Sequence, residues 1–462
     1  MLRQWKLRAG VLLLGLALMG GLTMVICGQA GPSQDAVTHP YPAGDNGDIW
    51  LLGGQSNMNG NGRLEEVHEP DPRILFYANN EGWEIAKDPL ANMFFPIGNQ
   101  HGPAPDYTHL PVGGSGLGLF FANHVIQATN RPLGLIGLQW GKPMTMIWDP
   151  TLMDKGEMPP PPYLYGRMIQ RVIEAGGYGK LKGMIWYQGE SDAVEFPNAS
   201  AVFEKNLLNF IDRVRRDTGN PNLPIIVVQL ARLMTSSVPG LPGTAGGETV
   251  SDVFATYTQA WEHVREVQRE MAQQRANVYV VASLDLYPMV DPIHLDFGAY
   301  QRLGPRIAEV ALSEIYKVPG HGTPIQLESI QVDPLPAFKT GEPVHGHSLI
   351  RIRFNGVNDK LQAAGRPSGF SLHFPAVGED VLKKGVPVIY TTEFDPKDPS
   401  AVLLRVKGEA AELKGIYKAV LYYGAGLDPY CNIVDGKDMA VPAFGPIELG
   451  SPGEKVPAGN AH

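Results

Sequence analysis

The sequence has 462 residues, of which 44% are hydrophobic and 18% are charged, and its formal net charge is -9. This length accommodates two or three domains, and the balance is that of an ordinary globular protein. The acidic charge, and the lack of Lys- and Arg-rich runs beyond the N-terminus, argue against a nucleic-acid-binding protein.

The first 30 residues have the pattern of a signal peptide. Arg3, Lys6 and Arg8 precede an apolar run over residues 9–27, and small residues follow at 28–30. We therefore expect a secreted or periplasmic protein whose polar lead covers residues 31–44. Contact with a membrane is expected only if the apolar run stays uncleaved as an anchor.

Strand and helix patterns alternate from residue 45 to residue 318. Apolar runs predict strands at Ile49–Leu52, Leu133–Gln139, Met184–Tyr187, Pro224–Leu230 and Val278–Ala282. Helical patterns lie between them, at Gly116–Thr129, Tyr163–Ala175, 203–214, Ser251–Ala276 and Gly298–Tyr316. Such alternation predicts an α/β domain with a doubly wound parallel sheet. Residues 61–115 show no period and are expected to be irregular.

Beyond residue 318 the pattern changes to short strands separated by Pro and Gly. The clearest are Ser348–Phe354, Val388–Thr392, Ala401–Val406 and Ala419–Tyr423. Residues 319–462 are therefore predicted to form a small antiparallel β-sandwich.

Ser56 follows the first predicted strand after Gly53, Gly54 and Gln55. A serine at the end of a parallel strand occupies the place where α/β enzymes hold reactive groups. The same residues also fit a plain turn in which the serine caps a short helix. This stretch alone does not decide between the two interpretations.

Three further polar clusters come directly after predicted strands or shortly before the last helix. They are Gln139-Trp140-Gly141-Lys142, Gln188-Gly189-Glu190-Ser191-Asp192 and Asp291-Pro292-Ile293-His294. Because parallel strands end at one edge of a sheet, these clusters can converge on Ser56.

The residue types in these clusters suit acyl transfer. A serine hydroxyl needs a base, for which His294 is the candidate, and Asp291 can hold the second ring nitrogen. The backbone amides of Ser56 and Gly141 and the side-chain amide of Gln188 are candidate oxyanion donors.

Each signal has a plainer interpretation. Asp-x-x-His pairs are common on surfaces, and tryptophans such as Trp140, Trp148 and Trp186 more often belong to a core than to a sugar-binding surface. His345 and His347 more often face solvent than bind a metal. The sequence has neither His-Glu-x-x-His nor a dinucleotide-binding glycine pattern, so we expect no metal and no cofactor.

Together, the motifs resemble those of the SGNH hydrolase superfamily. They are Gly54-Gln55-Ser56-Asn57-Met58, Trp186–Asp192 and Asp291–His294. The greater similarity is to sialate O-acetylesterase-like carbohydrate acetylesterases, and it spans about residues 45–318. The second cluster departs from the family pattern of two glycines and a threonine, because Lys142 and Pro143 follow Gly141.

The resemblance implies a three-layer αβα domain in which Ser56 is the nucleophile, His294 the base and Asp291 its partner. It implies Ser56, Gly141 and Gln188 as oxyanion donors. Gln55, Asn57 and Glu190, inside the motifs, are the expected substrate-binding residues.

We therefore expect a secreted serine esterase that removes O-acetyl groups from carbohydrate through an acyl-enzyme on Ser56. The expected partner is an acetylated carbohydrate, with no cofactor. Two alternatives remain open: a non-catalytic carbohydrate-binding protein of the same fold, and a lipolytic or thioester hydrolase of the same superfamily.

Overall fold

The computed structural model describes residues 39–64, 71–78, 82–90, 114–154, 164–194, 197–234, 250–287, 290–375 and 388–450. The predicted signal peptide at 1–30 and most of the predicted polar lead at 31–44 lie outside these residues. Among the described residues, no helix combines the length and the apolar character that a membrane crossing requires.

Seven strands of the described chain form one sheet in the order β3-β2-β4-β1-β5-β6-β7. All neighbours pair in parallel except β3, which is antiparallel to β2. The strands are β1 (Asp48–Gly54), β2 (Ile74–Tyr77), β3 (Trp83–Ile85), β4 (Leu133–Gln139), β5 (Leu181–Tyr187), β6 (Ile225–Gln229) and β7 (Val278–Ala282). The strands β2, β3 and β4 lie on one side of β1, and the later strands β5, β6 and β7 lie on the other. The strand order therefore reverses between β1 and β5. In such sheets ligands bind at the carboxyl ends of the strands beside this reversal.

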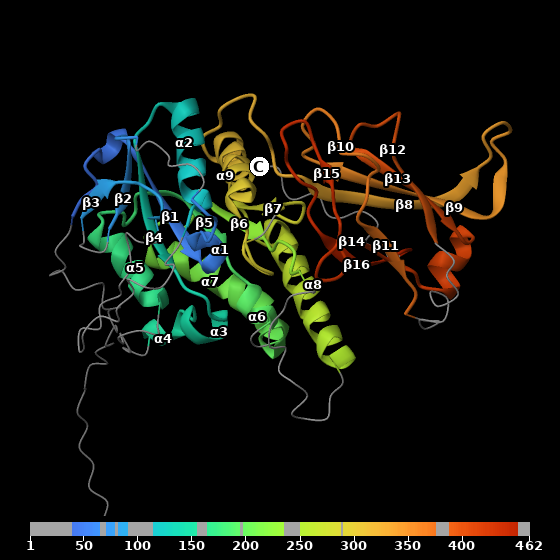
Figure 1. Cartoon of the computed structure of the whole chain (residues 1–462), viewed down its shortest axis with the longest axis horizontal. Helices are drawn as coiled ribbons and strands as arrows, with labels where there is room; N and C mark the ends of the chain where they lie inside the picture. The colour runs from blue at the N-terminus through green and yellow to red at the C-terminus, as the bar shows by residue number, and fades with distance from the viewer. Residues whose placement is uncertain are drawn as a thin grey trace, which may run out of the picture. The chain divides into compact units, whose positions relative to one another are not determined.

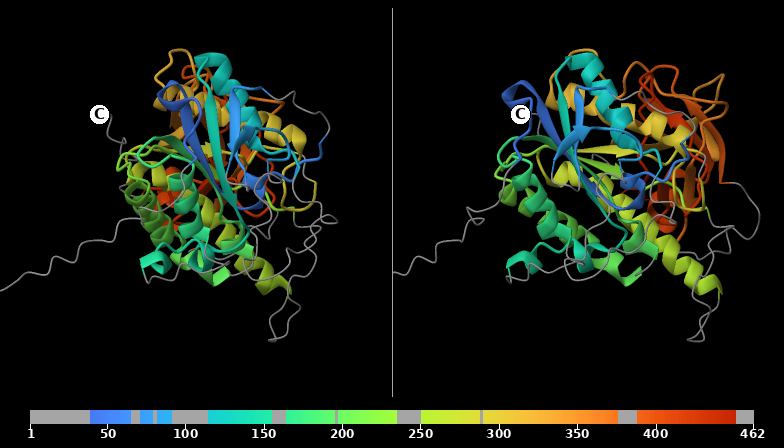
Figure 2. Two further views of the ribbon diagram at one scale, coloured as in Figure 1. Left: turned by 90° about the vertical axis from the view of Figure 1, so that its left-hand side faces the viewer. Right: turned by 60° about the vertical axis from the view of Figure 1, so that its left-hand side comes forward.

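Helices cover both faces of this sheet (Figure 1; Figure 2). One face carries α2 (Leu117–Thr129) and α9 (Phe297–Val310), and the other carries α5 (Leu164–Glu174), α7 (Phe203–Asp217) and α8 (Val250–Gln274). Short helices follow the strands or connect the longer elements: α1 (Ser56–Asn59), α3 (Met144–Ile147), α4 (Thr151–Asp154) and α6 (Glu190–Val194). The predicted doubly wound α/β architecture is confirmed.

Aromatic side chains fill the space between the sheet and the helices. On one face Trp50 of β1 packs against Phe121 of α2, with 4.8 Å between ring centroids. On the other face Trp186 of β5 packs against Phe210 at 4.2 Å and Trp148 at 5.1 Å. Because the sheet is covered on both sides, its central strands are continuous apolar runs rather than alternating ones.

The expectation that residues 61–115 are irregular is wrong for part of this segment. Residues 74–77 form β2, which pairs with β4, and residues 83–85 form the edge strand β3. Strands of four and three residues are too short to show a two-residue period. Pairing with a neighbouring strand, which no local pattern reveals, makes them part of the sheet.

The chain beyond residue 318 forms antiparallel sheets, as predicted. Within the described residues these are a four-stranded sheet in the order β12-β13-β9-β8, a three-stranded sheet in the order β11-β14-β16 and the pair β10-β15. The strands are β8 (Gln326–Pro336), β9 (Pro343–Asn355), β10 (Gln362–Ala363), β11 (Phe370–His373), β12 (Ile389–Phe394), β13 (Ala401–Lys407), β14 (Val420–Tyr423), β15 (Ile433–Val434) and β16 (Phe444–Glu448).

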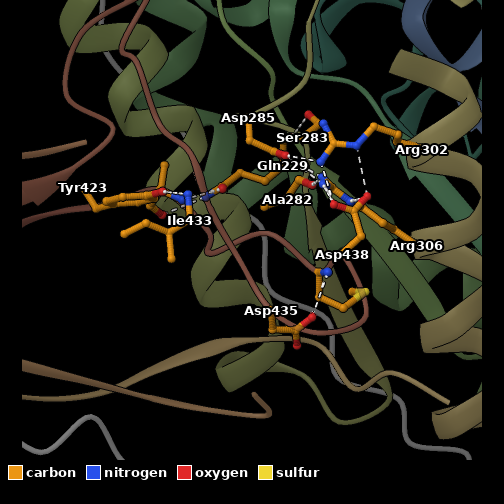
Figure 3. Close-up of polar contacts among 12 residues, drawn as sticks. Gln229, Ala282, Ser283, Asp285, Arg302, Arg306, Tyr423, Ile433, Asp435 and Asp438 are labelled. Atoms are coloured by element: carbon orange, nitrogen blue, oxygen red, sulfur yellow. Dashed lines mark hydrogen bonds and ion pairs between the residues drawn. The ribbon is translucent and has the colours of Figure 1, made fainter. Parts of the chain in front are cut away.

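Buried and partly buried polar contacts connect the α/β part to the β part (Figure 3). The guanidinium of Arg306 on α9 donates to both oxygens of Asp285 at 2.7 Å and to Asp438 of the β part at 3.1 Å. Arg302 also donates to Asp438, at 2.6 Å. The side-chain amide of Gln229 exchanges two hydrogen bonds with the backbone of Ala443, at 2.8 and 2.9 Å. The division into domains at residue 318 stays a prediction.

Candidate active site

Ser56 lies at the carboxyl end of β1, beside the reversal of strand order. The turn before it requires a glycine, because Gly54 has φ +147 and a Cβ atom there would lie 2.1 Å from the carbonyl oxygen of Tyr187. The N–H of Gln55 donates to that same carbonyl at 3.0 Å. The chain then enters α1, of which Ser56 is the first residue.

The structure brings Ser56, His294 and Asp291 together across 238 residues of chain. Oγ of Ser56 lies 2.9 Å from Nε2 of His294, and Nδ1 of His294 lies 2.6 Å from Oδ2 of Asp291. If Nδ1 carries the ring proton and donates a hydrogen bond to Asp291, Nε2 is free to accept the proton of the serine. This geometry is that of a nucleophile, a base and a group that orients the base.

The carboxylate of Asp291 is held from both oxygens. Its Oδ1 accepts hydrogen bonds from the backbone N–H groups of Ile293 and His294, each at 2.9 Å. Burial alone raises the pKa of Asp291, but the bonds from the His294 ring and from these two amides outweigh it, so its pKa falls below the ordinary value. Asp291 therefore stays ionised, as a partner for an imidazolium must.

Asn57 holds the backbone on both sides of His294. Its Nδ2 donates to the carbonyl of Ile293 at 3.0 Å, and its Oδ1 accepts from the N–H of Leu295 at 3.1 Å. Nδ2 also donates to Glu190 at 2.8 Å, and Oδ1 accepts from the Tyr300 hydroxyl at 3.1 Å. Asn57, directly after Ser56, thus fixes the loop that carries His294.

Gln55, Asn57 and Glu190, expected from the motifs to bind substrate, are only 3%, 1% and 2% exposed. Oε1 of Gln55 accepts from the N–H groups of Gly189 and Ser191 at 3.5 and 3.4 Å. Burial raises the pKa of Glu190, against a smaller lowering by its bond from Asn57. In this structure these side chains are buried and support the site through bonds to protein groups, and the expectation that they bind substrate stays a prediction.

Two of the three expected oxyanion donors are available to bind an oxyanion. Among the described residues, the N–H groups of Ser56 and Gly141 donate to no protein acceptor. Gly141 follows Trp140, whose N–H donates to the carbonyl of Gly54 at 2.9 Å, so Gly141 lies beside the β1 turn. A Cβ atom on Gly141 would meet nothing within 4 Å, which shows free space at this point.

The third expected donor, Gln188, is arranged differently. Its side chain is fully buried, and Nε2 donates to Oδ2 of Asp192 and, at 3.4 Å, to the carbonyl of Lys142. Asp192 also accepts from the N–H of Met144, and burial raises the pKa of Asp192 to about 7. In this structure the amide of Gln188 therefore supports the segment that carries Gly141, and it reaches an oxyanion only by leaving Asp192.

Sequence reasoning missed two supporting residues. Tyr300 lies on α9 with no motif around it, and its contact with Asn57 appears only in the folded chain. Asp192 lies inside a recognised motif, but the motif gives no sign that Asp192 accepts a hydrogen bond from Gln188. That bond depends on the short helix α6, in which Asp192 follows Glu190 by two residues.

The chain is similar to known carbohydrate esterases. Residues 46–313, more than half of the chain, match the family described as carbohydrate esterase, sialic acid-specific acetylesterase. The chain is 27% identical over 305 residues to a probable carbohydrate esterase of Arabidopsis thaliana, covering 62% of this chain and 98% of that protein. Its fold is similar to that of a carbohydrate acetylesterase from Xanthomonas citri, with a TM-score of 0.56 and 20% identity over 86% of this chain and 80% of the other. The chain therefore belongs to the sialic acid-specific acetylesterase family of carbohydrate esterases.

Proposed function

We propose that this protein is an exported serine esterase that removes O-acetyl groups from carbohydrate through an acetyl-enzyme on Ser56. The observation that carries the proposal is the hydrogen-bonded series from Ser56 through His294 to Asp291, with distances of 2.9 and 2.6 Å.

The first half of the reaction forms the acetyl-enzyme. Nε2 of His294 takes the hydroxyl proton while Oγ of Ser56 bonds to the acetyl carbon. The carbonyl oxygen becomes an oxyanion beside the N–H groups of Ser56 and Gly141, whose donors need no reorganisation. The tetrahedral intermediate then collapses, the bond to the sugar oxygen breaks, and the imidazolium returns its proton to that oxygen.

The second half releases acetate. Water loses a proton to His294 and attacks the acetyl carbon, a second oxyanion forms at the same donors, and Oγ of Ser56 leaves with the proton from the imidazolium. Asp291 stays ionised throughout and stabilises the imidazolium in both halves. No step requires a metal or a cofactor.

Carbohydrate as the alcohol portion is supported by the family and by an exposed aromatic ring near the site. Trp140, directly before Gly141, is 39% exposed, whereas Trp148 and Trp186 are buried. A flat ring on the surface can stack on the apolar face of a sugar. Export is supported by the basic and apolar pattern of residues 1–30 alone.

The test compares acetate release from acetylated xylan, acetylated sialic acid and pectin with hydrolysis of an aryl acetate. We expect Ser56→Ala to abolish both activities and to leave the fold intact. Ser371→Ala is the matched control, because Oγ of Ser371 also lies 3.0 Å from a histidine Nε2, that of His373 in the β part. Full activity in Ser56→Ala, or equal losses in the two variants, would contradict the proposal.

The same experiment separates the two alternatives. A lipolytic or thioester hydrolase would prefer acyl aryl esters longer than acetyl or cleave thioesters. A non-catalytic carbohydrate-binding protein would bind glycan and release no acetate.

A further inference from the structure

A cluster of two histidines and one glutamate lies outside the proposed active site. His124 is on α2, Glu309 is near the end of α9, and His321 is in the connection between α9 and β8. Nε2 of His124 and Nδ1 of His321 lie 2.8 and 3.0 Å from the same oxygen, Oε1 of Glu309. All three ligand atoms lie within 4.8 Å of one another.

We propose that His124, Glu309 and His321 bind a zinc ion that fastens α2, α9 and the connection to the β part. Two imidazole nitrogens and one carboxylate oxygen form a donor set that zinc accepts, with bonds of about 2.0–2.2 Å. Two adjacent ligands at that bond length are separated by roughly 2.8–3.6 Å around an octahedral or tetrahedral ion. The observed separations of 2.8 and 3.0 Å from Glu309 lie at the lower end of this range.

The carboxylate is prepared for a cation. Its second oxygen, Oε2, accepts from the N–H of Gly322 at 2.6 Å, which directs Oε1 toward the histidines. Nζ of Lys437 also faces the carboxylate, 3.9 Å from Oε2.

Access and position also suit a structural ion. The side chains of His124 and His321 are 32% and 20% exposed, so an ion can enter and water can complete its coordination. Glu309 lies twelve residues after the start of α9, about 18 Å along the helix from the end that follows His294. The cluster is therefore remote from the proposed reaction, and its ion would act on stability.

The site would tie together segments that otherwise meet through packing. A Cβ atom on Gly322 would lie 3.3 Å from Cβ of Lys437 and 3.4 Å from Cγ of Met439, both in the β part. An ion on the neighbouring His321 would hold this connection against α9. An ion that binds the folded chain and not the unfolded chain raises the melting temperature, and the rise grows as the free ion concentration exceeds the dissociation constant.

The test titrates zinc into the purified, chelator-treated, untagged protein by calorimetry and follows Tm. We expect one ion per chain, a Tm that rises by several degrees, and no response to Mg²⁺, which prefers oxygen ligands. His124→Gln and His321→Gln should each weaken binding by more than the about 10–100-fold that a supporting residue costs. The matched control is His345→Gln/His347→Gln, which removes a surface His pair whose His345 side chain is fully exposed and should bind zinc normally.

A second measurement needs no substitution. X-ray absorption of the zinc-loaded protein should show nitrogen and oxygen neighbours at about 2.0–2.2 Å, including two imidazoles. Stoichiometric zinc binding that survives both His→Gln substitutions, or no binding to the unmodified protein, would overturn the proposal and leave a purely hydrogen-bonded His–Glu–His cluster. Because esterase activity is not the readout, failure here is distinguishable from failure of the proposed reaction.

Discussion

Asn57→Ala should let the His294 ring move away from the hydroxyl of Ser56. The substitution removes four hydrogen bonds, two of which hold the peptide groups on either side of His294. At about 0.5–1.5 kcal/mol each, their loss costs about 2–6 kcal/mol of unfolding free energy. A shift of about 1 Å in the His294 ring costs on the order of a hundredfold in rate, so kcat should fall by about that factor.

The assay measures kcat and KM on an aryl acetate under conditions where urea unfolding shows that the variant is folded. A role confined to stability would lower the folded fraction and leave kcat per folded molecule unchanged. The positioning role predicts a lower kcat with little change in KM, since no substrate contact is removed.

Asn358→Ala provides the matched control in the β part. Asn358 also holds a loop backbone from both sides, donating to the carbonyl of Gly356 at 3.2 Å and accepting from the N–H of Thr323 at 3.0 Å. It also bonds a carboxylate, that of Asp435. We expect a comparable loss of stability and a normal kcat. If Asn57→Ala behaves in the same way, the inferred link between Asn57 and His294 is refuted.

Three further outcomes are expected. Asp291→Asn should lower kcat by about 10⁴-fold, because an amide no longer holds the His294 ring in the tautomer that can accept the serine proton, and an unchanged rate would contradict its role. The folded pKa of Asp192, about 7, lies above its ordinary value of 3.8, so the folded state binds the extra proton and stability falls as pH rises between these values. In urea unfolding, Asp192→Asn should remove about 2 kcal/mol of the fall between pH 5 and pH 7.5, and an identical slope in both proteins would count against this assignment. Trp140→Ala should raise KM for acetylated glycan at least several-fold while KM for aryl acetate stays normal; equal effects on both would show that the ring does not contact sugar.

The strands and helices that position the site could be predicted because their apolar patterns are local. Leu133–Gln139 and Val278–Ala282 are strands with the predicted bounds, since a strand covered on both faces is a continuous apolar run. The strand β2 and the edge strand β3 could not, because three or four residues carry no measurable period and only their pairing defines them, β2 with β4 and β3 with β2.

The convergence of Ser56, Asp291 and His294 could be inferred because all three follow strands of one parallel sheet. The surroundings of these residues could not. Gln55, Asn57 and Glu190 have side chains of the kind that binds sugars, and only the folded chain shows their hydrogen bonds to protein groups. The cluster of His124, Glu309 and His321 was equally invisible, because about 200 residues separate its first and last members and no motif joins them.

The central claim is that Ser56 carries the acetyl group. The most direct measurement is the mass of the intact protein, and of its Ser56 peptide, after rapid acid quenching during turnover of an acetyl ester. The account predicts one added acetyl group located on Ser56, absent in Ser56→Ala. Continued turnover with no acetylated Ser56, or acetylation at another residue that is competent for turnover, would contradict it.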